Sequence, residues 1–204
     1  MATTKNHRTG TKGVPRAQRE QLILDAAAHE FAHHGYATAS VAAIAQRSDI
    51  SKPLVYAYFN SKEGLSQACL HRAGKPLVQA VTDAQLPAPA HIRAAATLQA
   101  IFTTLQPRPH DWSVLYDPTL PPGTPTTTAQ HYRQRLNALG ATGISQILNH
   151  HGDHDPHDHD LLTQVWFSTV TTAVTWWLAH PEHSAQDMTH RCQRLLNTLL
   201  THPT

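Results

Sequence analysis

Hydrophobic residues recur every three or four positions along most of this 204-residue chain, which is the spacing of one face of an α-helix. Proline and glycine interrupt that spacing between the segments. No stretch alternates residue by residue as a strand does. The pattern therefore predicts an all-α protein with helices over 16–34, from 41 to near 48–49, and over 52–59, 61–85, 90–105, 112–116, 126–149, 160–180 and 184–200. Within 61–85, the stretch at 74–76 contains glycine and proline, so that helix is either continuous or broken there.

The segment 40–65, SVAAIAQRSDISKPLVYAYFNSKEGL, has the strongest local signals. Ser40 and Ser51 each precede a short apolar repeat and can cap a helix, and Pro53 falls in a first turn, where helices accept proline. Asp49 lies between the two helices, and aspartate tolerates the left-handed backbone of a tight turn. Two short helices joined in this way form a helix-turn-helix, whose second helix can enter the major groove of DNA.

IAQRSDISKPLVYAYFNSKEGL resembles the hallmark segment of the tetracycline-repressor (TetR) family of bacterial transcriptional regulators, and ILDAAAHEFAHHGY is similar to the family's opening helix. The resemblance covers residues 23–65. It implies an all-helical homodimer with an N-terminal three-helix DNA-binding domain and a C-terminal helical domain for ligand binding and dimerisation. Asp49 replaces the usual turn glycine, and Pro53 and Leu54 replace the usual residues of the recognition helix. The operator sequence therefore does not follow from the resemblance.

Three parts of the chain follow from this interpretation: a disordered basic arm over 1–15, a DNA-binding domain over 16–62 and a ligand-binding and dimerisation domain over 63–204. The arm either contacts DNA or only aids solubility. The net charge of +2 is unevenly distributed, because residues 1–62 hold eight Lys and Arg against four Asp and Glu. Basic charge in the first domain suits binding to phosphates.

The cellular compartment is predicted from the lack of membrane-spanning and export signals in the sequence. No apolar run is long enough for a membrane span, and the polar, basic first residues do not form a signal peptide. Cys69 and Cys192 lie far apart without a CxxC partner, which suits a reducing compartment. We expect a cytoplasmic protein.

The resemblance and the helix geometry together assign DNA-contacting roles. Ser40 and Lys62 are expected to meet phosphates and Tyr56 and Tyr58 the DNA backbone, although an aromatic residue here can equally pack the domain. The start of the second helix is expected to approach base edges. The full candidate set is Ser40, Arg47, Ser51, Lys52, Pro53, Leu54, Tyr56, Tyr58 and Lys62.

Aromatic residues at helical spacing in the second domain form either its core or a ligand pocket. The candidates are Phe102, Trp112, Tyr116, Tyr132, Trp166, Phe167 and Trp176. An apolar pocket predicts a hydrophobic or aromatic inducer. The apolar stripes of the last two helices predict a dimer surface that includes Val170, Val174, Leu195 and Leu199.

Two motifs suggest other chemistry. The segment 150–160 is rich in histidine and aspartate and forms either a connector or a metal-sensing loop, with His150, His151, His154, His157 and His159 as ligands. Residues 29–33 read HEFAH and match the HExxH motif of zinc hydrolases. Because His29 and His33 lie opposite the apolar stripe of their helix, they are expected to face solvent rather than a catalytic cleft.

The main hypothesis is a non-enzymatic, cofactor-free repressor. A homodimer binds a near-palindromic double-stranded operator, and a small molecule releases it. The alternatives are a metal-responsive regulator that uses the loop 150–160 and a zinc hydrolase that uses residues 29–33.

Overall fold

The described part of the computed structural model, residues 13–85 and 88–200, consists of helices and the turns between them, and it contains no strand. The all-α prediction is confirmed. Of the proposed arm over 1–15, residues 1–12 lie outside the described residues. The helices are α1 (Arg16–Thr38), α2 (Val41–Arg47), α3 (Lys52–Phe59), α4 (Lys62–Asp83), α5 (Ala90–Leu105), α6 (His110–Leu115), α7 (Thr124–His150), α8 (Pro156–Leu178) and α9 (Ala185–Leu200).

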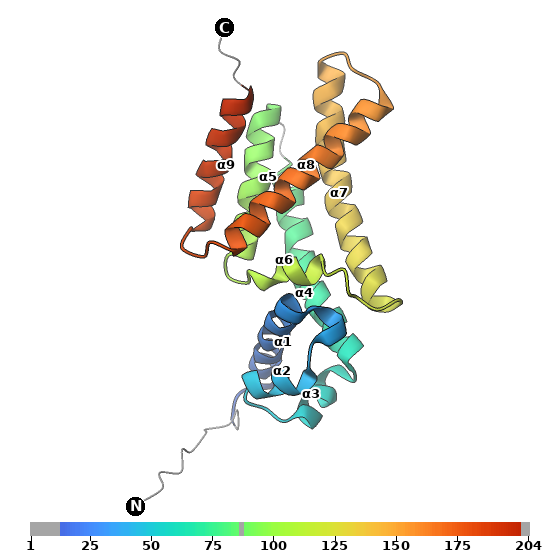
Figure 1. The fold of residues 1–204 in the computed structure, drawn as a ribbon, viewed down its shortest axis with the longest axis vertical. Helices are drawn as coiled ribbons and strands as arrows, with labels where there is room; N and C mark the ends of the chain where they lie inside the picture. The colour runs from blue at the N-terminus through green and yellow to red at the C-terminus, as the bar shows by residue number, and fades with distance from the viewer. Residues whose placement is uncertain (1–12, 86–87, 201–204) are drawn as a thin grey trace, which may run out of the picture.

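Helices α1, α2 and α3 pack together with the start of α4 at one end of the molecule (Figure 1). The predicted caps are present, since the Ser40 side chain accepts from the Ala43 N–H and the Ser51 side chain from the Leu54 N–H. Asp49 has a φ of 54°, which is the left-handed turn that the sequence predicted. Helix α1 continues for one turn beyond its predicted end, but Gly35 marks a break with a φ of 68°.

Helix α4 joins this end to the rest of the molecule (Figure 1). It runs unbroken through Pro76, so the alternative of a break at 74–76 is wrong. Helix α4 packs against α5, α6 and α7, and Leu77, Val78 and Val81 are buried just beyond the proline. The proposed boundary at residues 62 and 63 therefore falls at the start of a helix that both parts share.

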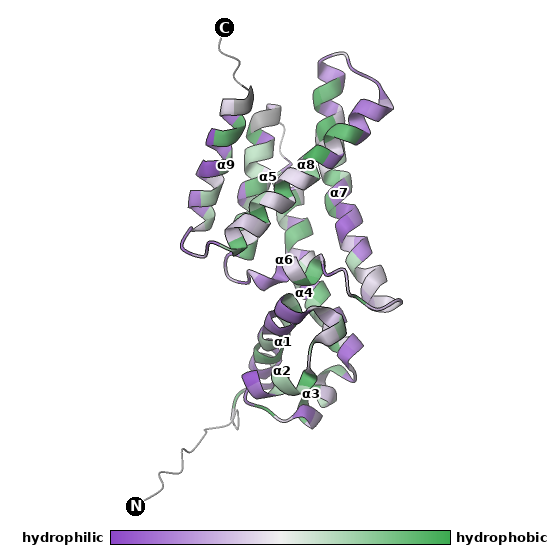
Figure 2. Cartoon of the chain, viewed as in Figure 1, coloured by the Kyte–Doolittle hydropathy of each residue, from purple (hydrophilic) through white to green (hydrophobic). Residues whose placement is uncertain are grey.

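Helices α5, α7, α8 and α9 form the other end of the molecule, and the short α6 crosses between the two ends (Figure 1). Helix α8 begins at Pro156, four residues earlier than predicted, because the Asp155 side chain caps it by accepting from the His157 N–H at 2.8 Å. The hydrophilic turn between α7 and α8 is therefore shorter than the segment 150–160 (Figure 2).

A continuous hydrophobic core runs through both ends and includes residues from α1 through α9. Within this core the backbone of Gly74 in α4 lies against the Tyr132 ring of α7, and a Cβ on this glycine would lie 2.2 Å from Tyr132 Cγ. Among the described residues, no helix has the length and apolar character needed to cross a membrane.

Candidate DNA-binding surface and ligand pocket

The start of α3 is open to solvent. Ser51, Lys52 and Pro53 are exposed there, and Ser40 and Arg47 are exposed on α2. Leu54 and Tyr56 are half-buried, and the Lys52 ammonium lies 5.9 Å from the centre of the Tyr56 ring. The first turn of α3 thus presents a cation and free polar groups to whatever approaches this face.

Tyr58 lies at the other end of α3 and is tied to α1. Its hydroxyl accepts from Arg19 Nη1 at 3.3 Å, and the Arg16 guanidinium lies 5.2 Å from its ring centre. The ring therefore also helps to dock α1 on α3, which is the packing role that the sequence left open for one of the two tyrosines.

Lys62 is half-buried and leans on the end of α1. Its Nζ donates to the Ala37 carbonyl at 3.5 Å and lies 4.7 Å from the centre of the Tyr36 ring. Burial lowers the pKa of Lys62, and the Glu30 carboxylate partly opposes that effect. The side chain would have to leave these contacts, at least in part, to meet a phosphate.

Polar bridges that the sequence did not reveal connect α1 to α6 and the loop after it. The Asp117 carboxylate accepts from the backbone N–H of Tyr36 at 2.6 Å and from that of Thr119 at 2.7 Å. Arg72 of α4 pairs with exposed Asp25 of α1 at 2.6 Å and with buried Asp111 of α6 at 3.3 Å. These bridges fix α6 relative to the DNA-binding helices.

An apolar cavity of about 110 Å³ lies between α4, α5, α6, α7 and α8. Four of the predicted aromatic residues line it: Trp112, Tyr116, Trp166 and Phe167. Trp112 and Tyr116 come from α6 and stack with their ring centres 4.4 Å apart. The polar groups at the cavity come mainly from the residues just after α4 and from α5, where Gln85, Arg93 and Thr97 line it.

The other three predicted pocket residues lie elsewhere. Phe102 is fully buried and packs edge-on against Trp177. Tyr132 fills the space over Gly74, and its hydroxyl lies 2.9 Å from His71 Nδ1. Trp176 is partly exposed and stacks on His180. Their helical spacing predicted that they lie on apolar helix faces. The spacing could not show whether each face meets the core, the cavity or solvent.

The predicted dimer surface needs correction. Val170 and Val174 are 5% and 0% exposed, because they face the core of their own chain. Leu195 is 59% exposed, whereas the side chain of Leu199 lies outside the part of the chain whose side chains the structure describes. Leu195 lines a largely apolar groove of about 780 Å³ between α8 and α9, which also includes the exposed Val165.

The histidines of the segment 150–160 do not form a common site. His154 Nδ1 lies 2.8 Å from the Asn149 side chain. His159, in the first turn of α8, lies beside Ser145 of α7. His150 and His151 have ring centres 5.7 Å apart, and His157 is exposed on α8. Within the described residues, the group of three side chains placed to share a metal ion is a different one, consisting of His29, His33 and His110.

The HExxH segment lacks the arrangement of a hydrolase. Glu30 is buried and its Oε1 accepts from the Ser40 N–H at 2.9 Å, so the carboxylate caps α2 instead of facing a metal-bound water. His33 is exposed as predicted, but His29 is half-buried against α6. The zinc-hydrolase alternative therefore has no free general base.

Comparisons with known proteins agree with this geometry. Residues 23–69 match the model of the family described as bacterial regulatory proteins, tetR family. The transcriptional activator FasR of Mycolicibacterium smegmatis is 39% identical over 71 residues, which are 35% of this chain and 32% of FasR. The match to this curated relative thus spans about a third of its length.

Solved structures resemble nearly the whole chain. A TetR-like transcriptional regulator from Rhodococcus sp. RHA1 is 26% identical with a TM-score of 0.70, over 93% of this chain and 100% of that one. The transcriptional regulator FadR from Bacillus subtilis, solved in complex with stearoyl-CoA, is 18% identical with a TM-score of 0.63, over 86% of this chain and 96% of that one.

The fold and the exposed start of α3 define a helix-turn-helix protein of the kind that regulates transcription. Residues 23–69 match the DNA-binding domain of the TetR family of bacterial regulatory proteins, and nearly the whole chain resembles a solved TetR-like regulator.

Proposed function

We propose that this protein is a homodimeric transcriptional repressor that binds a near-palindromic DNA operator and is released by a small hydrophobic or aromatic ligand. The observation that carries the proposal is the capped, exposed start of α3 on a basic three-helix domain joined through α4 to a second domain with an apolar cavity.

DNA binding is supported by charge and geometry. Lys52 and Arg47 are exposed on α3 and α2, and residues 1–62 carry a net positive charge. A recognition helix contacts bases through its first residues while neighbouring cations neutralise phosphates. Pro53 and Leu54 are accordingly the residues that we assign to base edges, with Ser40, Arg47, Ser51 and Lys52 on the backbone.

The ligand class is supported by the cavity lining. Trp112, Tyr116, Trp166 and Phe167 offer flat, apolar surfaces, and Arg93 places one cation at the side of the cavity. An aromatic or aliphatic molecule with an acidic group fits this lining. FadR, which has a similar fold, was solved in complex with stearoyl-CoA.

Helix α6 provides the route from the cavity to the DNA-binding domain. Trp112 of α6 and Tyr116 just after it line the cavity. Asp111 of α6 pairs with Arg72, which also pairs with Asp25 of α1. A ligand that enlarges the cavity would therefore displace α6 and α4 together, and in a dimer this changes the spacing of the two α3 helices.

The test of DNA binding is selection of duplexes from a random-sequence pool by the full chain. We expect a near-palindromic motif with half-sites one helical turn, about 34 Å, apart, because a two-fold dimer presents two recognition helices on one face of DNA. Recovery of no preferred sequence would overturn the proposed function.

The test of the ligand site uses the selected motif and a Gly143→Leu variant. Gly143 lines the cavity, and no described neighbouring side chain lies within 4 Å of its Cβ position, so leucine fills the space. We expect the variant to bind the motif as the parent does but to resist release by an aromatic or acyl carboxylate that releases the parent. Equal release of both proteins would place the ligand elsewhere.

A further inference from the structure

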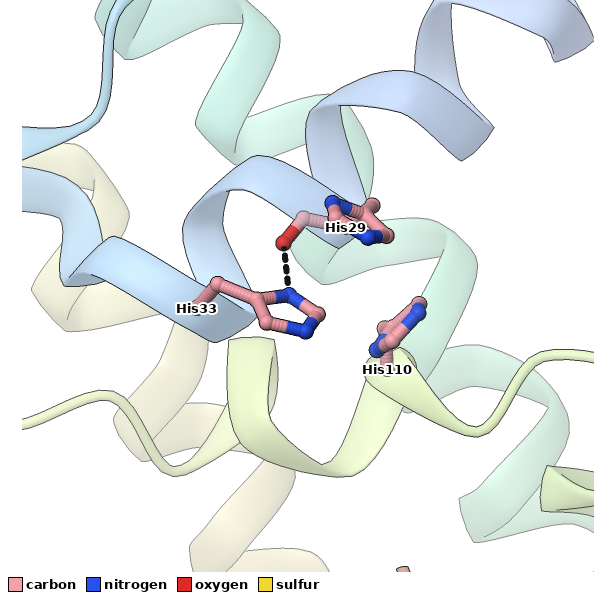
Figure 3. Close-up of side chains that lie close together, drawn as sticks. All are labelled: His29, His33 and His110. Carbon is pink, nitrogen blue, oxygen red and sulfur yellow. Dashed lines mark hydrogen bonds between the residues drawn. The ribbon is translucent and has the colours of Figure 1, made fainter. Parts of the chain in front are cut away.

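Three histidines from two distant parts of the chain meet where α1 contacts α6 (Figure 3). His29 and His33 are one turn apart on α1, and His110 is the first residue of α6. The ring centre of His110 lies 5.0 Å from that of His29 and 5.1 Å from that of His33. The rings of His29 and His33 stack with their centres 4.0 Å apart, so the three side chains form one compact cluster.

The spacing of the ring nitrogens suits a metal ion. One nitrogen from each histidine lies within 4.8 Å of the other two. Zinc binds imidazole nitrogen at about 2.0–2.1 Å, so tetrahedral ligands lie about 3.3 Å apart. Small shifts of the three side chains, with His33 Nδ1 kept on the His29 carbonyl, can close this difference.

Hydrogen bonds leave the right atoms free. His33 Nδ1 donates to the His29 carbonyl at 2.7 Å, which leaves Nε2 with its lone pair, and a backbone carbonyl commonly orients a metal-binding histidine in this way (Figure 3). His29 Nδ1 is buried and has no hydrogen-bond partner among the described residues. No protein group therefore fixes the tautomer of His29.

The electrostatic surroundings of the rings act in the same direction on two of them. Burial, followed by the other histidines of the cluster, lowers the pKa of His29 and of His110, and the neutral imidazole is the form that binds metals. Nearby Arg47 lowers both pKa values further, and its positive charge opposes a bound cation, whereas Glu30 acts in the opposite direction on His29.

We propose that His29, His33 and His110 bind a divalent transition-metal ion of the zinc, cobalt or nickel type, and that this ion clamps α6 to α1. Imidazole-only donors favour these ions over magnesium or calcium. A groove of about 610 Å³ lined by His33 and His110 gives the ion a path from solvent, and water from this groove can complete the coordination.

The site is a clamp rather than a hydrolytic centre, because the neighbouring Glu30 carboxylate is held at the start of α2. Its ligands come from α1 of the DNA-binding domain and from α6, the helix that lines the cavity. Metal binding therefore fixes the two helices relative to each other, in parallel with the Arg72 bridge.

The first experiment titrates untagged, chelator-treated full-length protein with Co²⁺ and follows the visible absorption of the bound ion, with Zn²⁺ in competition. We expect one tight site per chain. His33→Ala and His110→Ala should each weaken binding at least about tenfold, since each removes a ligand. His34→Ala is the matched control on the same exposed face of α1 and should bind as the parent does.

The segment 150–160 is the competing source of imidazole. A variant with His151, His154 and His157 replaced by glutamine should keep the tight site. Loss of binding in that variant, with full binding in His110→Ala, would overturn the proposal. Circular dichroism and thermal unfolding without metal establish that each variant is folded.

The second experiment measures amide hydrogen exchange with and without Zn²⁺. We expect Zn²⁺ to slow exchange in α6 and to raise the Tm of the parent by about 5 °C or more at a hundredfold excess over Kd, and to do neither in His110→Ala. Unchanged exchange in α6 of the metal-loaded parent would contradict the clamp. Helix α9, which is remote from the site, serves as the internal reference.

Discussion

Gly74 shows how a single residue sets the distance between two helices. A Cβ at this position would lie 2.2 Å from Tyr132 Cγ, inside the contact distance of any two carbon atoms. The absence of a side chain thus allows the Tyr132 ring to lie on the backbone of α4. Glycine inside a helix lowers the stability of that helix by about 1 kcal/mol relative to alanine.

We expect Gly74→Ala to lower the free energy of unfolding by about 1–3 kcal/mol, because the Tyr132 ring must move out of its packed position. Urea unfolding measures the change. Gly143→Ala is the matched control in a helix, since its added methyl has no described neighbour within 4 Å, and it should be neutral or stabilise by up to about 1 kcal/mol. Equal destabilisation by both substitutions would contradict the proposed overlap.

Arg72 holds two carboxylates in different surroundings. The Asp111 side chain is 5% exposed, whereas that of Asp25 is 61% exposed. Burial raises the pKa of Asp111, and the charges of Arg72 and Arg108 act against this effect. Loss of the buried Arg72–Asp111 pair should therefore change the free energy of unfolding more than loss of the exposed Arg72–Asp25 pair, since exposed ion pairs contribute little.

Asp111→Asn should therefore lower the free energy of unfolding by about 2 kcal/mol or more, because the charge-assisted bonds to Arg72 and Arg108 are lost in a buried place. Asp25→Asn, which removes the exposed partner of the same arginine, should cost less than about 1 kcal/mol. Chemical unfolding of the two variants under the same conditions checks the ratio. A larger effect at Asp25 would mean that the exposed bridge dominates.

At the scale of elements, α3 and the start of α4 offer two lysines in different settings. Lys52 is exposed at the first turn of α3, whereas Lys62 is half-buried and binds the Ala37 carbonyl and the Tyr36 ring. The sequence assigned the phosphate contact to Lys62 and placed Lys52 near base edges. The geometry favours Lys52 for the phosphate contact, because a cation that already has partners gains less from a phosphate.

We expect Lys52→Ala to weaken binding to the selected DNA motif and to reduce the slope of log affinity against log salt by about 1. Lys62→Ala should reduce the slope by less. Lys75→Ala, an exposed lysine further along α4, should leave the slope unchanged. Titrations at several salt concentrations measure all three, and a slope change in Lys75→Ala equal to that in Lys52→Ala would point to a general charge effect.

At the scale of the whole molecule, the groove between α8 and α9 is the apolar surface that a single chain leaves open. Val165 and Leu195 are 51% and 59% exposed there, and Trp176 is 37% exposed. A second copy of these two helices, related by a two-fold axis, would cover the groove. We propose this surface in place of the predicted one at Val170 and Val174, which belong to the core of the single chain.

Leu195→Glu should give a folded monomer with weakened operator binding. A two-fold interface would bury two unpaired glutamate charges, one from each chain, and this destabilises the dimer. Analytical ultracentrifugation and circular dichroism measure assembly and folding separately. Ile92→Glu is the matched control, since Ile92 is 50% exposed on α5 and does not line the groove. A parent protein that stays monomeric at micromolar concentration would remove the proposed dimer.

The sequence by itself determined the features that depend on neighbouring residues. Serine caps, the left-handed turn at Asp49 and the period of 3.6 residues are local, so the bounds of α2, α3 and α5 agree with the prediction. The HExxH pairing of His29 with His33 is also local, because four residues make one helical turn.

Only the tertiary structure decided which faces meet. The period identifies an apolar face but not its partner, so it could not separate the cavity residue Trp112 from the core residue Phe102, or the buried Val174 from the exposed Leu195. It also could not bring His110 to His29 and His33, since that contact arises from the crossing of α6 over α1. Periodicity is a property of one helix, whereas a site between helices depends on how they pack.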